Sequence, residues 1–205
     1  RHAKDGQWWI DNPQRSLANN TAVYTEKPDA GIFMHEWLAL YSSKSGERGI
    51  FNRKAAQNQA IKTGRRDPNH EYSTNPCGEI LLRPNQFCNL SEVIIREHDT
   101  LDSLKRKVKY ATILGTLQAS LTDFRYLRKI WRDNTEEEAL IGVSLTGIMD
   151  NKITSDKDIV EIDSFLTELK EEAIKVNKKY AKIIGINQAT AVSCVKPSGT
   201  VSQMV

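Results

Sequence analysis

Apolar residues recur every three or four positions in two long stretches of the chain, and this spacing predicts amphipathic helices. The first stretch, residues 101–121, carries a face made of Leu101, Leu104, Val108, Ala111, Leu114 and either Leu117 or Gln118. The second stretch, residues 155–183, carries an apolar face made of Ile159, Ile162, Leu166, Leu169, Ala173 and Val176. Ser155 begins an N-terminal capping pattern for the second helix, with Asp158 three positions later.

Shorter helices and strands are expected between these stretches. Asp29 can cap one helix, and Gly64 ends another over residues 53–62. A further helix is expected from Asp123 towards Trp131. Short apolar or β-branched runs predict strands at residues 21–24, 79–82, 87–95, 139–148 and 190–195. Strands that alternate with long helices predict an α/β architecture without an internal domain boundary.

Composition and charge argue against several classes of protein. Acidic and basic residues are interspersed along the 205 residues and leave a net charge of +3, so no nucleic-acid partner is expected. No apolar run approaches the roughly 18 residues of a membrane span. Histidines and cysteines show no metal-ligand spacing, so no metal site is expected. Three cysteines without a dense framework fit the reducing cytoplasm.

The most informative stretch is Asn-Pro-Cys-Gly-Glu-Ile at residues 75–80. In an extended chain alternate side chains share a face, and Asn75, Cys77 and Glu79 would then point the same way. An amide, a thiol and a carboxylate would reach one small ligand from a backbone that Pro76 restrains. The alternative is a buried cysteine in an ordinary turn, because free cysteine behaves mainly as a small hydrophobic side chain.

A second candidate is the loop Val-Lys-Pro-Ser-Gly-Thr-Val-Ser at residues 195–202. If small hydroxyl residues and a glycine open a helix here, unpaired backbone N–H groups can bind an anion. Lys196 could add a cation. The loop lacks the Gly-x-x-x-x-Gly-Lys-Ser/Thr pattern of a P-loop, and a plainly capped helix start is the alternative.

Several stretches, in the same order, resemble the ribonucleotide reductases. Residues 75–80 resemble the active-site loop of the adenosylcobalamin-dependent class II enzymes, and residues 87–93 resemble the segment that holds a reducing cysteine. Residues 15–21 and 46–53 resemble the family's Asn-Asn-Ser and Gly-Glu-Pro-Gly blocks. In these blocks Thr21 replaces the usual serine and Arg48 the usual proline. The loop at residues 195–202 resembles the one that holds the substrate's phosphates.

The resemblance implies a role for each candidate residue. Cys77 would become a thiyl radical that abstracts the C3′ hydrogen of the ribose, Glu79 would act as general base on the 3′-hydroxyl, and Asn75 would hydrogen-bond the ribose hydroxyls. Cys88 would supply reducing equivalents and end in a disulfide. Its partner is expected upstream of this chain, with Cys194 as a structural residue. The phosphate-binding residues would be Pro197, Ser198, Gly199, Thr200 and Ser202.

The resemblance also implies a fold, a cofactor and partners. The fold would be part of a ten-stranded α/β barrel with Cys77 on a central finger loop. Residues 1–205 would form one partial domain, incomplete at both ends. The implied cofactor is adenosylcobalamin, with no contact residue assignable. The implied partners are a ribonucleotide substrate, a triphosphate in preference to a diphosphate, a deoxynucleotide effector and a thioredoxin-type reductant.

Three other functions stay open. The large-subunit core of a class I ribonucleotide reductase shares much of the same core. A nucleotide-binding module without catalysis has no need of a thiol flanked by an amide and a carboxylate. A thiol–disulfide oxidoreductase that uses Cys77 and Cys88 would normally space its cysteines two residues apart.

Overall fold

The computed structural model describes residues 3–16, 20–44, 46, 48–155 and 158–198. The chain divides into two compact units, unit 1 at residues 1–84 and unit 2 at residues 85–205. No shift in composition marks this boundary in the sequence. The assignment of residues 1–205 to one partial barrel domain stays a prediction.

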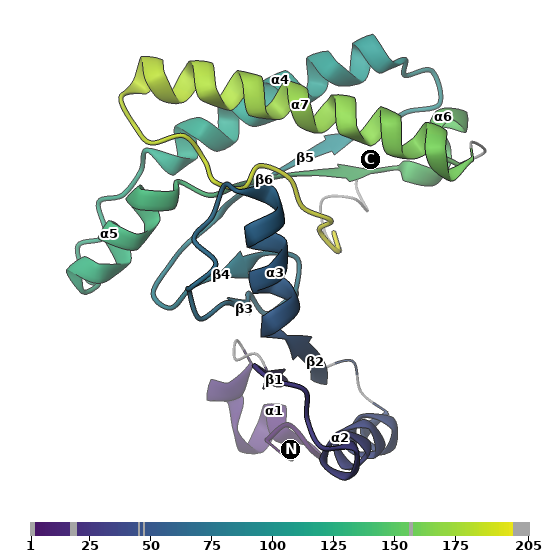
Figure 1. Cartoon of the computed structure of the whole chain (residues 1–205), viewed down its shortest axis with the longest axis vertical. Coiled ribbons are helices and arrows are strands. Elements are labelled where there is room, and N and C mark those ends of the chain that lie inside the picture. Colours follow the sequence, from purple (N-terminus) through teal and green to yellow (C-terminus); the bar gives the residue numbers. More distant parts are fainter. Residues whose placement is uncertain (1–2, 17–19, 45, 47, 156–157, 199–205) are drawn as a thin grey trace. The chain divides into compact units, whose positions relative to one another are not determined.

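Unit 1 contains a parallel strand pair and a short hairpin (Figure 1). Strands β1 and β2 pair in parallel through the crossover helix α2, and β3 pairs with β4 in an antiparallel hairpin. The predicted strand at residues 21–24 is confirmed as β1. The elements are α1 (Trp8–Asp11), η1 (Pro13–Arg15), β1 (Asn20–Tyr24), α2 (Ala30–Ser43), β2 (Arg48–Asn52), α3 (Arg53–Thr63), β3 (Ser73–Thr74) and β4 (Leu81–Leu82).

Helix α2 begins where the sequence predicts. The Asp29 carboxylate accepts hydrogen bonds from the backbone N–H groups of Gly31 and Ile32, which satisfies two donors of the first turn. Its apolar side chains are largely exposed on the unit, and Trp37 is 55% exposed. The buried residue of this helix is Glu36. Helical spacing thus located α2 correctly, but the spacing did not identify its buried side chain.

Helix α3 fixes the base of the β3–β4 hairpin. It ends at Gly64, as predicted, and packs Ala56 and Ala60 against Tyr72, which is fully buried. The Tyr72 hydroxyl donates to the Asp67 carbonyl at 2.6 Å. The Arg53 Nε donates to the Tyr72 carbonyl at 2.7 Å. These contacts fix the β3–β4 hairpin to α3.

Unit 2 is built on parallel strands β5 and β6. The segment 191–194 extends this sheet beside β6, since the Val143 N–H donates to the Val192 carbonyl at 2.9 Å and the Cys194 N–H donates to the Val143 carbonyl at 3.2 Å. The strand predicted at residues 190–195 is therefore confirmed in part, as a single bridge at Ser193. The elements are β5 (Asn89–Ile94), α4 (Leu101–Ala119), α5 (Lys129–Glu138), β6 (Ile141–Thr146), η2 (Ile148–Asp150), α6 (Lys152–Ser155) and α7 (Ile159–Ile184).

Helices α4 and α7 lie side by side and cover β5 and β6 (Figure 1). Their interface also carries a buried polar network. The Asn177 amide donates to the Thr116 hydroxyl at 3.0 Å and accepts from the Ala189 N–H at 2.9 Å. The largest fully buried apolar side chains of the surrounding core are Ile95, Leu104, Ile141 and Val192.

The predicted apolar faces of both long helices are partly wrong. On α4 Leu104 and Val108 are buried, but Leu114 and Leu117 are 54% and 48% exposed. Gly115 is the physical reason, because a Cβ there would lie 3.4 Å from Ile141 and the helix approaches the sheet along this small-residue side. On α7 Leu166 is 43% exposed, whereas its neighbour Phe165 is buried (6%). The side chain of Ile159 lies outside the described residues.

Two predicted helix starts are also wrong. Helix α7 is capped by Asp158, whose carboxylate accepts from the N–H groups of Val160 and Glu161, whereas Ser155 ends α6. Helix α5 starts at Lys129 instead of Asp123. At the start of α7, the carboxylate of Asp158 satisfies two N–H groups by itself, so this helix needs no capping residue further upstream.

Candidate active site

Residues 75–80 form a tight hairpin loop. The Gly78 N–H donates to the Asn75 carbonyl at 3.0 Å, and the Ile80 N–H donates to the Asn75 Oδ1 at 3.1 Å. The predicted extended segment with alternating side chains is therefore wrong. Pro76 suits the second position of such a turn, and Gly78 adopts a φ of +85°. Cys77 lies at the tip of this loop and is exposed.

Cys77 lines a cavity of about 480 Å³ within unit 1. The cavity joins the Cys77 loop to the two upstream blocks that the sequence singled out, since Asn20, Thr21, Arg48 and Gly49 also line it. Neither Asn75 nor Glu79 is among its lining residues. The tertiary structure thus places the Cys77 thiol at the same cavity as the two upstream motifs. The Asn75 amide does not line this cavity and helps to close the loop at residues 75–80.

The parallel pairing of β1 and β2 explains the composition of the upstream blocks. Asn20 is opposite Arg48, and Thr21 is opposite Gly49. A Cβ at Gly49 would lie 3.2 Å from the Thr21 hydroxyl oxygen, so glycine allows the close approach. Two motifs that are separated in the sequence therefore form adjacent parts of one cavity wall.

Two buried polar atoms of residues that line this cavity have no hydrogen-bond partner among the described residues. They are Asn20 Nδ2 and Arg48 Nε. The Arg48 guanidinium is also bound through its Nη2, which pairs with the Glu36 carboxylate. The sequence analysis did not select Arg48, although its departure from the family's proline was a signal.

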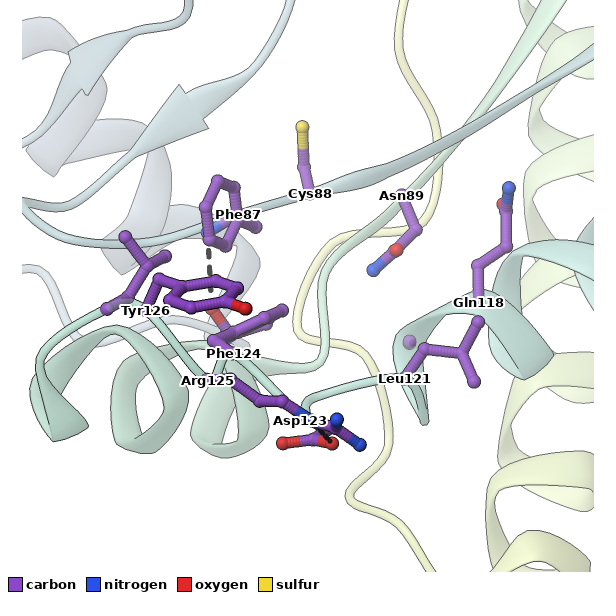
Figure 2. A pocket seen from close by; sticks show the side chains of 12 residues that line it. Phe87, Cys88, Asn89, Gln118, Leu121, Asp123, Phe124, Arg125 and Tyr126 are labelled. Carbon is purple, nitrogen blue, oxygen red and sulfur yellow. Dashed lines mark hydrogen bonds and ion pairs between the residues drawn. The ribbon is translucent and has the colours of Figure 1, made fainter.

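Cys88 lies in unit 2, directly before β5, and is half-buried. Figure 2 shows its sulfur directed away from the Asn89 side chain and from the segment 121–126. The preceding Phe87 packs against Phe124 and Trp131, with ring centroids 5.0 Å and 4.8 Å apart. Phe87 and Phe124 line a cavity of about 450 Å³ that Cys88 also lines. An aromatic cluster therefore fixes the backbone next to this thiol.

The predicted phosphate loop is described as far as Pro197 and Ser198, and Gly199, Thr200 and Ser202 lie outside the described residues. The Ser198 hydroxyl donates to the Glu92 carboxylate at 2.8 Å. The Lys196 ammonium lies 3.7 Å from the same oxygen of Glu92. An anion bound here would compete with Glu92, a residue that the sequence analysis did not select.

Two further findings concern the described residues as a whole. None of their helices combines the length and apolar character needed to cross a bilayer. Within the same ranges, no cluster of three His, Cys, Asp or Glu side chains is placed to hold a metal ion.

The fold is that of a class II ribonucleotide reductase over nearly the whole chain. A crystal structure of a B12-dependent (class II) ribonucleotide reductase superposes with a TM-score of 0.62 at 23% sequence identity. The match covers 98% of this chain and 32% of that chain. The prediction of an α/β fold that forms part of a barrel is thereby confirmed.

Proteins with similar sequences are named as enzymes of the same class. An adenosylcobalamin-dependent ribonucleoside-triphosphate reductase of Lactobacillus acidophilus is 27% identical over 96% of this chain. The enzyme of the same name from Lactobacillus leichmannii is 27% identical over 91%, and that of Euglena gracilis is 28% identical over 62%. The chain spans about 28% of the length of the Lactobacillus relatives. No family model matches the chain. The resemblance to class II reductases is thereby confirmed.

Proposed function

We propose that this chain is the part of a class II ribonucleotide reductase that carries the substrate-attacking cysteine. The complete enzyme would convert ribonucleoside triphosphates to deoxyribonucleotides. The observation that carries the proposal is the exposed thiol of Cys77, at the tip of a tight loop in a cavity built from the other motif blocks. A rigid loop supported by packed secondary structure is suited to hold a reactive atom in one position.

The chemistry at the ribose uses three residues of the loop. A Cys77 thiyl radical takes the hydrogen atom from C3′, which restores the thiol and leaves a carbon radical on the ribose. Glu79 accepts the proton of the 3′-hydroxyl, and the 2′-hydroxyl takes a proton from a thiol of the reducing cysteine pair and leaves as water. At the end the ribose radical takes a hydrogen atom back from the Cys77 thiol, which restores the thiyl radical. The Glu79 Oε2 atom is buried without a hydrogen-bond partner among the described residues, and Glu79 does not line the cavity at Cys77, so its role rests on the resemblance. Asn75 would hydrogen-bond the ribose hydroxyls and also stabilises the loop.

The reduction of the ribose then requires two electrons. Cys88 and a second cysteine would supply them, forming a disulfide and delivering the hydrogen that replaces the 2′-hydroxyl. Cys88 lies in unit 2 and Cys77 in unit 1, so the two thiols are presented by separately packed structures. The loop that begins at Pro197 would hold the substrate's phosphates, with Ser198 released from Glu92.

The relatives' names extend the proposal to a cofactor. Adenosylcobalamin would generate the radical that removes the hydrogen atom from the Cys77 thiol. The described residues do not fit a role in holding it, because the cavity at Cys77 is of a size suited to a nucleotide, at about 480 Å³, and no set of side chains is assignable to a corrin. We therefore assign no cofactor contact to this chain.

The remaining partners belong to the complete enzyme. A deoxynucleotide effector would select the substrate, and a thioredoxin-type reductant would reduce the Cys88 disulfide. A thioredoxin-type reductant would fit a location in the cytoplasm, where thiols are kept reduced. The exposed Cys77 disfavours a binding module without catalysis, and the relatives' cofactor favours class II over class I.

The Cys77→Ser variant of the complete enzyme tests the central step. Turnover should be abolished, because an O–H bond is too strong to act as the radical carrier, while nucleotide binding stays near normal. Cys194→Ser is the matched control, since this half-buried cysteine is predicted to be structural. Substantial nucleotide reduction by Cys77→Ser, measured as deoxynucleotide formed per enzyme, would contradict the proposal.

The Cys88→Ser variant tests the reducing step separately. Without an external thiol it should allow at most about one turnover per enzyme, because the radical step is intact but the reducing pair is incomplete. A rapid-quench count of deoxynucleotide gives the result. Continuous cycling driven by thioredoxin in this variant would refute the assigned role of Cys88.

A further inference from the structure

Arg48 lines the cavity at Cys77. Its side chain is 4% exposed, and the Glu36 side chain that pairs with its Nη2 is 8% exposed. Glu36 lies on α2 and is the buried residue of that helix. A buried guanidinium requires such a partner, because an unpaired buried charge is strongly destabilising.

The ion pair does not satisfy the whole guanidinium. The Nε of Arg48 is buried and has no acceptor among the described residues. Buried N–H groups in native proteins are nearly always paired with protein, water or ligand. Since Arg48 lines the cavity, a ligand bound there can supply the missing acceptor.

The charges around the cavity indicate the chemistry of this ligand. Lys4 and Arg48 both line the cavity, where the Arg48 charge is paired with that of Glu36, and no aspartate or glutamate is among its described lining residues. The buried amide nitrogen of Asn20 is another donor without a described partner. Donors and positive charge together favour a ligand rich in anionic oxygen atoms. A nucleotide has this chemistry and suits a cavity of about 480 Å³.

We propose that Arg48 is a nucleotide-binding residue of the Cys77 cavity. Its Nε–H donates to a ribose or phosphate oxygen of the ribonucleotide, and Glu36 is the positioning residue that orients the guanidinium. The inference rests on the proposed function, because it takes the ligand at Cys77 to be the ribonucleotide substrate.

Binding is measured in the complete enzyme carrying Cys77→Ser, so that turnover does not consume the ligand. Equilibrium dialysis compares a ribonucleoside triphosphate with the corresponding nucleoside. Arg48→Gln should weaken triphosphate binding at least about tenfold, the usual effect of losing a charge-assisted hydrogen bond. An equal loss for the nucleoside identifies a ribose oxygen as the acceptor, and an unchanged nucleoside affinity identifies a phosphate. Lys62→Gln, at an exposed cation of α3, is the control and should leave both affinities unchanged.

Additional variants separate binding from folding. Arg48→Gln combined with Glu36→Gln removes both charges and so leaves no unpaired buried carboxylate, and it should bind as weakly as Arg48→Gln. Arg48→Lys keeps a cation for Glu36 but lacks the planar guanidinium, so it should also weaken binding. Glu36→Gln alone retains an acceptor for Arg48 and should lose affinity by a smaller factor.

A failure of the inference about Arg48 and a failure of the proposed function would give different experimental results. Unchanged affinity for both ligands in folded Arg48→Gln and Arg48→Lys enzymes would overturn the inference about Arg48 and leave the proposed function standing. Nucleotide reduction by the Cys77→Ser parent would overturn the proposed function itself. A KM increase in the Arg48→Gln enzyme with Cys77 intact, with kcat changed by a smaller factor, would support Arg48 as a binding residue.

Discussion

The two units differ in how their buried polar groups are hydrogen-bonded. In unit 2 the buried Asn177, Thr116 and Asn151 all form hydrogen bonds within the packed core. At the Cys77 cavity of unit 1, buried atoms of Arg48 and Asn20 have no partner among the described residues. A satisfied network stabilises a unique fold. Unsatisfied groups reduce stability and are expected where a ligand completes the site.

The exceptions in unit 2 sharpen this comparison. Glu92 Oε1 and Gln118 Oε1 are buried and without a hydrogen-bond partner among the described residues. Glu92 lies against the predicted phosphate loop, and Gln118 lines the cavity beside Cys88. Four of the unpaired atoms, on Asn20, Arg48, Glu92 and Gln118, therefore lie beside residues with proposed functional roles, whereas the buried Nε of Arg83 in unit 1 does not line either cavity.

The largest expected effect tests the packed core. Leu104→Ala should reduce the free energy of unfolding by about 2–5 kcal/mol, because Leu104 is a fully buried residue of α4. Leu114→Ala on the same helix is the matched control and should change it by less than about 0.5 kcal/mol, since Leu114 is exposed. Urea unfolding of the full chain gives both values. Equal losses for the two variants would show that the α4 face has been assigned wrongly.

A smaller effect is expected at the Cys77 loop. Gly78 has a φ of +85°, and an added Cβ would meet no atom within 4 Å, so substitution strains the backbone without a steric clash. Gly78→Ala should cost about 1–2 kcal/mol within the loop and lower kcat/KM about tenfold. Gly64→Ala carries a similar φ of +64° away from the cavity and controls for backbone strain. If both variants retained full kcat/KM, the loop conformation would not matter for the reaction.

The smallest effect concerns Asp99 in unit 2. Burial by itself raises the pKa of Asp99, but hydrogen bonds from Lys107, Ser103 and the Arg96 N–H outweigh burial and hold the pKa below its usual value. Because the folded pKa is lower than the unfolded one, Asp99 contributes stability above pH about 4 and loses it as the pH falls through the folded pKa.

Replacing Asp99 therefore tests the pH dependence of unit 2. Asp99→Asn should lower stability at neutral pH by less than about 1 kcal/mol and flatten the loss of stability in acid. Unfolding curves between neutral pH and pH about 2 give the comparison. An acid profile that runs parallel to that of the parent would exclude the Lys107 interaction as its cause.

The sequence correctly predicted those helices and strands whose position depends on residues close by in the chain. The Asp29 cap of α2, the Gly64 stop of α3 and the buried strand β6 all follow from signals within a few residues. The helix from residue 101 was found from its period, but its contact side was not. Gly115 faces Ile141, and helical spacing cannot show that small residues pack against the sheet.

The sequence by itself determined the alternation of strands and helices, the motif order and the candidate residues Cys77 and Cys88. These follow from local backbone preferences and from the resemblance. Only the tertiary structure decided that the 75–80 stretch is a closed turn and that Cys77 shares a cavity with Arg48. The pairing of Glu92 with Ser198 is a further long-range contact. Such contacts depend on strand pairing and chain crossover, which bring distant residues together and which no local pattern records.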